Sequence, residues 1–419
     1  MQRKLVYALS PAPHVPLCFM LAAPWFALLA ALVLLAAGAP AFASRWTMPL
    51  LAATHLLTLG YLTMTMAGSM LQLIPVVAGV PVLLGRAAAA VTWGGLALGT
   101  PLLAAALGLN LTFLFVPAAI VLAAGLAPLM VGLTRMLLRA APAPALPMVR
   151  GMRIALAGLA LTVGLGIALA CAFGGAAAVP VPLLVDLHAA WGLLGWVLML
   201  VVCVAFQVVP MFQSTRLYPA PVARWAALLL WTLLAAWSAL RIGAPERSLP
   251  VIALLAAFAA AYAGLSAWLL AKPQRKQADA STLYWRLALA CLGASAVLVL
   301  LPAGDTLTLV TGIVFVGGFA MGVVNGMLYK IVPFLLWYHL QEQPHAVKGS
   351  VPKLREIIDD GRARRQFWWH AAALAALIGA AVQPAWLARP AAVLLAVACL
   401  LLAIDLARAT WRWRALQPS

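Results

Sequence analysis

MLQLIPVVAG at residues 70–79, VAFQVVPMF at 204–212 and MLYKIVPFLL at 327–336 share one pattern: Gln or Lys, two branched apolar residues, then proline. Aligning the prolines places a glycine 15 residues before each of them, at Gly60, Gly195 and Gly318. The copies stand 135 and 123 residues apart in a chain of 419 residues, so the repeat divides the whole sequence into three similar parts.

Composition assigns the chain to the membrane proteins. Apolar residues make up 66% of the sequence and charged residues 9%, with a mean hydropathy of +1.06. A soluble domain has about 45–50% apolar and about 25% charged residues. Apolar runs long enough to cross hydrocarbon as α-helices recur along the chain, separated by short polar or basic segments. The sequence therefore predicts an all-α integral membrane protein.

Twelve membrane-spanning helices are expected. Their approximate ranges are 18–40, 50–74, 87–107, 111–134, 153–174, 183–209, 222–240, 249–271, 285–302, 307–330, 367–387 and 390–409. They form a single transmembrane domain of three four-helix blocks, about 1–145, 146–280 and 281–419, with pseudo-threefold symmetry. The repeat falls on the second helix of each block, so these three are the expected inner helices.

The first span has two interpretations. Basic residues precede it and Ala41-Phe42-Ala43 resembles a signal-peptide cleavage site. Its apolar run of about 23 residues exceeds the 7–15 of a signal sequence, which favours a retained helix. With the N-terminus inside, 23 of the 27 basic residues fall at cytoplasmic ends, and the other four are Arg45, Arg241, Arg247 and Arg389. This bias predicts a bacterial inner-membrane protein with both termini cytoplasmic.

The net charge of +18 is thus explained by topology, with the lipid bilayer as partner and no nucleic acid. The five cysteines lie in apolar spans without paired spacing, so disulfides are not expected.

Polar side chains of the inner helices have an architectural interpretation. Gln72, Gln207 and Lys330 stand one turn before the repeat prolines, where they would satisfy carbonyls that proline leaves free or reach the cytoplasmic interface. Asn325 is a mid-membrane amide suited to bridging helices. Alternatively, the glutamines and the lysine line a transport pathway between the inner helices.

Two histidines are the main candidate ligands. His55 opens the second span and His188 opens the sixth, both near the outer side. An ionisable residue within a span indicates a functional site, and neutral imidazoles ligate haem iron and copper. A hydrogen-bonded interfacial role is the alternative for both. The two residues precede their glycines by five and seven positions, about 200° apart on an ideal helix, which weakens the pairing.

Asp186, two residues before His188, would orient that imidazole or be solvated at the helix N-terminus. Sulfur side chains are a further possibility. Met64, Met199 and Cys203 lie on the glycine-bearing face of the inner helices, where we expect them to face the symmetry axis. There they would suit Cu(I), or they would simply fill the core.

The chain resembles subunit I of the haem-copper oxidases and also the NnrS type of haem- and copper-containing membrane protein. The resemblance depends on the twelve spans and on THLLTLGYLTMTMAGSMLQLIPVVAG, DLHAAWGLLGWVLMLVVCVAFQVVPMF and GFAMGVVNGMLYKIVPFLLWYHL. It implies that His55 is an axial ligand of a low-spin haem and that His188 is a copper ligand. The oxidase histidines of helices seven and ten are missing here, so a complete binuclear centre is not expected.

The resulting hypothesis is an inner-membrane protein that binds haem b, copper or both near the periplasmic face. The resemblance implies a role in respiration or nitric oxide tolerance, with respiratory membrane proteins as possible partners. Two alternatives stay open at this point. One is a transporter or channel, and the other is a cofactor-free accessory or assembly subunit.

Overall fold

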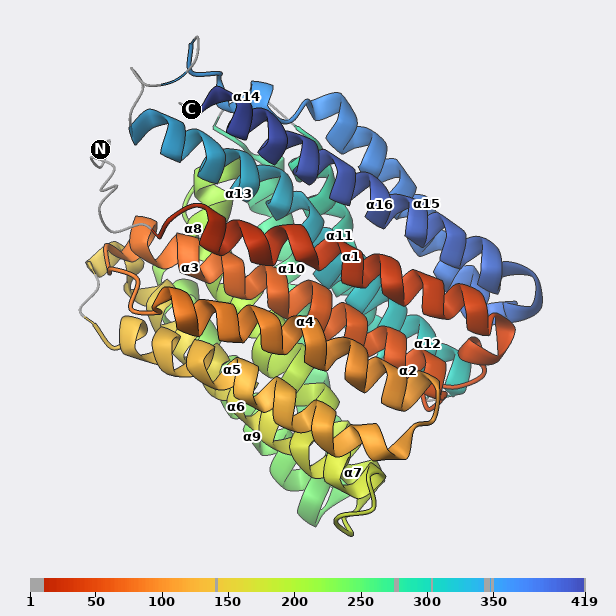
Figure 1. The fold of residues 1–419 in the computed structure, drawn as a ribbon. Coiled ribbons are helices and arrows are strands. Elements are labelled where there is room, and N and C mark those ends of the chain that lie inside the picture. The colour runs from red at the N-terminus through yellow and green to blue at the C-terminus, as the bar shows by residue number, and fades with distance from the viewer. Residues whose placement is uncertain are drawn as a thin grey trace.

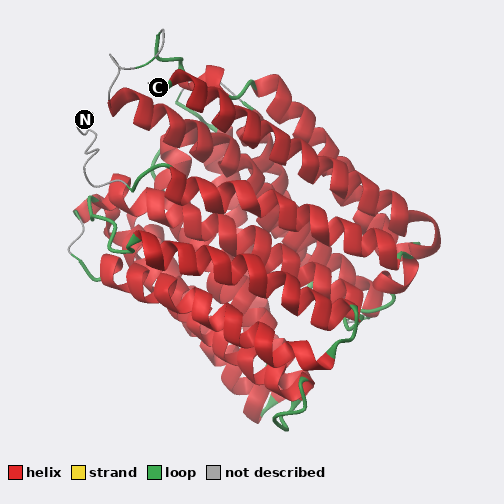
Figure 2. Ribbon diagram, viewed as in Figure 1, coloured by secondary structure: helices red, strands yellow, loops and turns green. Residues whose placement is uncertain are grey.

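The computed structural model describes residues 11–139, 142–274, 279–302, 304–342, 347 and 350–417. Within these ranges the chain forms helices and connecting segments and no strand (Figure 2). The all-α fold class is therefore confirmed.

The helices lie side by side, with their axes nearly parallel (Figure 1). Within the described ranges, nine long α-helices surround the three inner helices, which are described below. The nine are α1 (His14–Ala37), α4 (Arg86–Gly108), α5 (Phe115–Leu137), α6 (Leu146–Phe173), α9 (Ala220–Gly243), α10 (Leu249–Ala271), α11 (Ala280–Leu298), α15 (Asp360–Val382) and α16 (Pro384–Leu416). Short 3-10 turns at Ala39–Phe42, Thr112–Leu114, Ala143–Ala145 and Pro245–Arg247 and the one-turn helix α14 (Leu354–Ile357) lie in the connections.

The three inner helices are each built from three consecutive segments. The first consists of α2 (Met48–His55), η3 (Leu56–Thr63) and α3 (Met64–Ala78). The second consists of α7 (Val181–Ala190), η6 (Trp191–Leu198) and α8 (Met199–Gln213). The third consists of α12 (Asp305–Ile313), η8 (Val314–Ala320) and α13 (Met321–Glu342). All three middle segments are π-helical, and each contains the repeat glycine.

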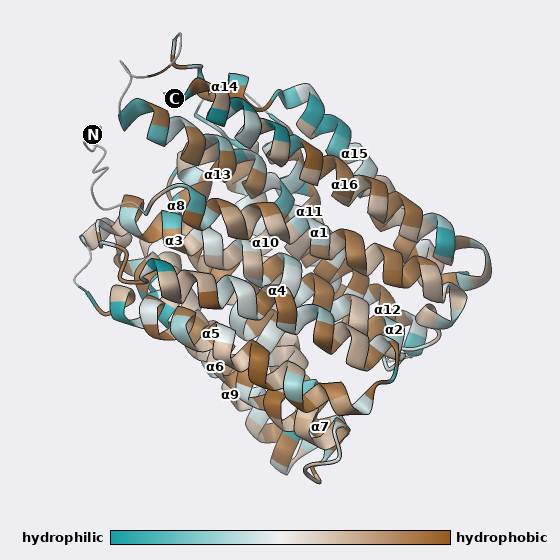
Figure 3. Cartoon of the chain, viewed as in Figure 1, coloured by the Kyte–Doolittle hydropathy of each residue, from teal (hydrophilic) through white to brown (hydrophobic). Residues whose placement is uncertain are grey.

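Eleven helices of the described chain are long and apolar enough to span a membrane. The twelfth expected span, α15, has 23 residues, but its first turns carry DGRARR. It lies alongside α16, and the start of α1 and the end of α16 lie at the same end of the bundle (Figure 1). Hydrophilic residues gather at the helix ends, while the middle of the bundle is apolar (Figure 3).

The repeat glycines allow close packing within each block. A Cβ on Gly60 would overlap Phe26 of α1, one on Gly158 of α6 would overlap the backbone of Gly195, and one on Gly318 would overlap Cys291 of α11. In every copy, the part of the inner helix around the repeat glycine therefore packs against the first helix of its own block. Glycine is required there because the approach leaves no room for a side chain.

Another face of each inner helix meets its two counterparts around a central cavity of about 70 Å³. The lining positions correspond in the repeat alignment: Thr65, Leu200 and Val323; Met66, Val201 and Val324; Ser69, Val204 and Met327; Leu73, Val208 and Ile331. This correspondence shows that the three inner helices are related by an approximate threefold axis.

Candidate functional site

His55 and His188 meet, although they belong to different inner helices. His55 ends α2 and His188 lies in α7, each just before a π-helical segment. Their ring centroids are 6.0 Å apart, and the ring planes are inclined by 22°. Interruptions of this kind in α-helices are frequent at functional sites.

Hydrogen bonds fix the tautomer of both imidazoles. Nδ1 of His55 lies 2.8 Å from the carbonyl oxygen of Leu51, one turn earlier in the same helix. Nδ1 of His188 lies 3.0 Å from the carbonyl oxygen of Thr162 in α6. A carbonyl only accepts, so Nδ1 carries the proton in each neutral ring and Nε2 keeps its lone pair. Metal-ligating histidines are commonly held in this way.

A seam of small residues brings His188 to α6. Gly158 packs on Gly195, Gly192 packs on Thr162, and Gly166 packs on His188. A Cβ on Gly166 would lie 3.1 Å from Cε1 of His188. The glycines thus let the two helices approach closely enough for the imidazole to reach the Thr162 carbonyl.

Both imidazoles line a cavity of about 240 Å³ between the first and second inner helices. The walls come from these two helices and from α4, α5 and α6, and they are mainly Leu, Val, Ala and Phe. Hydroxyl groups are contributed by Thr54, Thr58, Thr63 and Thr162. Among the described residues, none of the third inner helix lines this cavity, so it lies beside the threefold axis rather than on it.

The offset of the two histidines in the repeat therefore does not weaken their pairing, contrary to the expectation from the sequence. Equivalent positions on symmetry-related helices converge only on the axis. Two side chains that meet beside the axis must leave their helices in different directions. The offset of about 200° on an ideal helix provides such a difference.

Asp186 takes neither of its expected roles. Its carboxylate binds the guanidinium groups of Arg45, at 2.9 Å, and Arg241, at 2.8 Å. It is therefore an ion-pair partner of two arginines that were predicted to face outward, rather than a solvated cap or a hydrogen-bond acceptor for His188.

The predicted sulfur ligands lie away from this cavity. Met64, Met199 and Cys203 are buried, and none is among the residues lining either cavity. The side chain of Cys203 packs against Gly151 of α6. The expectation that this face of the inner helices points to the axis was wrong, because the glycine face packs outward against the first helix of each block.

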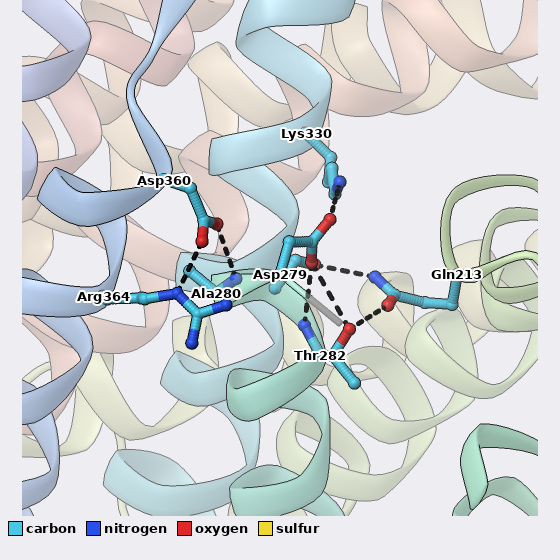
Figure 4. Close-up of polar contacts among 8 residues, drawn as sticks. Gln213, Asp279, Ala280, Thr282, Lys330, Asp360 and Arg364 are labelled. Atoms are coloured by element: carbon cyan, nitrogen blue, oxygen red, sulfur yellow. Dashed lines mark hydrogen bonds and ion pairs between the residues drawn. The ribbon is translucent and has the colours of Figure 1, made fainter. Parts of the chain in front are cut away.

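The three polar residues before the repeat prolines differ in their surroundings. Gln72 is buried, and neither polar atom of its amide has a hydrogen-bond partner among the described residues, so it does not bind the carbonyl freed by the proline. Gln207 is partly buried. Lys330 pairs with Asp279, which also caps α11 by accepting from the Thr282 backbone N–H (Figure 4). None of Gln72, Gln207 and Lys330 lines the central cavity.

Asn325 bridges helices, as the sequence suggested. Its Oδ1 accepts from the Tyr61 hydroxyl of the first inner helix at 2.5 Å, and its Nδ2 lies 3.3 Å from Nδ1 of His370 in α15. The ring of Tyr284 lies 5.9 Å from that of His370. These residues form a second buried polar cluster.

A neighbouring carboxylate, Asp405 of α16, was not predicted as a site residue from the sequence. It is 3% exposed, accepts from the Tyr329 hydroxyl at 3.0 Å and lies 3.6 Å from Nη1 of Arg362. A signal was present, because Asp405 is a carboxylate inside an otherwise apolar run.

The donors that the fold brings together are few. Within the described ranges, no three His, Cys, Asp or Glu side chains are placed to hold one metal ion. The arrangement at the cavity is a pair of neutral imidazoles in an apolar chamber. Such a pair suits a group that takes two protein ligands on opposite sides.

No family model and no curated protein matches the chain. Among solved structures, a haem-copper terminal oxidase determined as a dimer by cryo-electron microscopy is similar to it, with a TM-score of 0.60. The match covers 97% of this chain and 84% of that chain at 15% sequence identity. The chain has a haem-copper-oxidase-like fold. Identity this low concerns the fold alone, and nothing in the match is specific to the NnrS type.

The resemblance implied that His55 is a ligand of haem and that His188 is a ligand of copper. The structure places both imidazoles at one cavity.

Proposed function

We propose that the protein binds one haem b between His55 and His188 and acts as an electron carrier of a respiratory chain in the bacterial inner membrane. The single observation that carries this proposal is the pair of facing imidazoles, both with Nδ1 bonded to a carbonyl and Nε2 free to ligate. The apolar chamber around them supports the proposal because a porphyrin is largely apolar.

The separation of the rings is compatible with one metal ion held by both histidines. Two imidazoles that each ligated the same metal ion through a bond of about 2 Å would have ring centres about 6 Å apart. The observed centroid distance is 6.0 Å.

Haem is favoured over copper by the donor set. A copper site would need further ligands close to the imidazoles. Met64, Met199 and Cys203 do not line the chamber, and its hydroxyl groups are poor ligands for copper. A haem brings four nitrogens of its own and needs only the two histidines.

The chain's own residues would bind and orient the group. The carbonyls of Leu51 and Thr162 hold the imidazoles in the ligating tautomer, and the apolar walls exclude water. Bound haem supplies one-electron redox chemistry. If both histidines held the iron, a haem here would suit electron transfer better than the capture of a gaseous ligand such as nitric oxide.

Spectroscopy on the purified protein tests the proposal. We expect a Soret band, about one iron per chain and the spectrum of a six-coordinate haem that does not bind carbon monoxide when reduced. His55→Ala and His188→Ala should each abolish that spectrum, whereas His339→Ala, at the far end of α13, should leave it unchanged. Wild-type protein that stays colourless after haem is added, or that carries copper instead, would contradict the proposal.

Transport through the centre of the bundle has less support. The central cavity is small and almost wholly apolar, and the polar residues of the repeat lie outside its lining. No specific observation supports the role of an accessory subunit. Haem-free protein with uptake activity in vesicles would favour transport.

A further inference from the structure

A cation lies against one of the residues that line the chamber. Trp46, in the connection before α2, lines the chamber and is 39% exposed. The guanidinium carbon of Arg45 lies 4.6 Å from the centroid of its indole ring. Arg45 itself does not line the chamber, but one side of its guanidinium is packed on the ring of a residue that does.

Arg45 is also one of two cations that share a single carboxylate. Asp186 binds Arg45 through Oδ1 and Arg241 through Oδ2, and the side chain of Asp186 is 15% exposed against 40% and 35% for the arginines. The three groups therefore have a net charge of +1. Arg45 is free to turn to another anion, because Arg241 continues to neutralise Asp186.

We propose that Arg45 is the anion-binding group of the chamber and takes a carboxylate of an amphiphilic ligand whose apolar body lies between the histidines. For haem, that carboxylate is a propionate. This inference rests on the proposed function and deepens it, since it assigns a residue of the chain to the polar edge of the cofactor.

The surroundings of the chamber favour such a ligand. An apolar chamber with a cation next to its wall complements a molecule with an apolar body and an anionic edge. The same cation repels a bare metal ion. Because the Arg45 guanidinium is planar and has several donors, it can bind a carboxylate with two hydrogen bonds.

A comparison of two porphyrins tests the assignment. Haem-free protein is titrated with haemin and with haemin dimethyl ester, which has the same ring and iron but no propionate charge, and the Soret band reports binding. The wild type should bind haemin about 10- to 100-fold more tightly than the ester, as expected for a charge-assisted hydrogen bond. Arg45→Gln should lose most of this preference and keep its affinity for the ester, which also shows that the variant is folded.

Arg247→Gln is the matched control. Arg247 is another arginine predicted to face outward, but its side chain is 79% exposed and its nearest acidic partner is the adjacent Glu246. This variant should keep the full preference for haemin. Arg45→Lys retains the charge and should keep part of it, and it gives the same comparison if Arg45→Gln does not fold.

The outcomes separate the two proposals. Equal affinity of the wild type for both porphyrins, or an unchanged preference in both Arg45 variants, overturns the role of Arg45 and leaves the haem proposal standing. Failure of the wild type to bind either porphyrin overturns both.

Discussion

His55 and His188 face each other across 6.0 Å although they stand at different positions in a repeated sequence, five and seven residues before their glycines. Their cavity lies beside the threefold axis, between two of the three inner helices. The repeat supplies the scaffold, and a departure from the repeat supplies the site. The third copy has Thr311 and Ile313 at the corresponding positions, so it offers an imidazole at neither of them.

Gly166 should control the orientation of His188. In Gly166→Ala the new methyl group would lie 3.1 Å from Cε1 of the imidazole and push the ring from its position. A side chain forced from its rotamer costs about 0.5–1.5 kcal/mol, so haem affinity should fall about 2- to 10-fold in a Soret titration.

Gly164 lies on the same helix, and Gly164→Ala is the control for this prediction. A Cβ at this position would have no neighbouring atom within 4 Å. Both alanines strengthen the helix by similar amounts. Equal haem affinities for the two variants would show that Gly166 does not position His188.

The hydrogen bond between Tyr61 and Asn325 should be measurable as a coupling energy. It joins the first and third inner helices at 2.5 Å in a buried environment. In a double-mutant cycle of Tyr61→Phe and Asn325→Leu, unfolding in detergent should give a coupling of about 1–1.7 kcal/mol, in the upper range found between membrane helices. The hydroxyl of Ser295 donates to a carbonyl of its own helix. A control cycle of Tyr61→Phe with Ser295→Ala should therefore give no coupling energy.

Arg362 should be needed mainly to compensate Asp405. Arg362→Gln leaves a buried carboxylate whose remaining partner, within the part of the chain that the structure describes, is the Tyr329 hydroxyl. We expect a loss of about 1–3 kcal/mol in the free energy of unfolding. The value is below that of a fully buried pair, because Arg362 is 36% exposed. Adding Asp405→Asn should recover most of the loss. Persistence of the full loss in the double variant would mean that Arg362 acts through other contacts.

Lys330 should contribute less to stability than its partner. The Lys330–Asp279 pair is partly exposed, so Lys330→Gln, which restores the residue type of the other two copies, should cost less than about 1 kcal/mol. Asp279→Ala also removes the cap of α11 and should cost about 1–2 kcal/mol. The comparison is made by thermal unfolding in detergent, and a larger effect of Lys330→Gln would contradict this ranking.

The positions of most helices followed from the sequence, because long apolar runs in lipid must become helices. The predicted ranges 367–387 and 390–409 correspond to α15 and α16, but the boundary between them was placed too late, because the two helices meet at Gln383. Pro384 begins α16, whereas Pro390, where the break was expected, lies inside that helix. Proline is favoured in the first turn of a helix and is tolerated within membrane helices, so the two residues could not be ranked from the sequence.

The sequence by itself determined the membrane environment, the three related inner helices and the two histidines as candidate ligands, because composition, periodicity and residue chemistry are local properties. Only the tertiary structure decided which side of each inner helix faces the axis. It directed Cys203 outward to α6, joined Asp186 to two arginines and brought His55 to His188 beside the axis. These outcomes depend on how closely neighbouring helices pack, which is set by pairs of residues far apart in the chain.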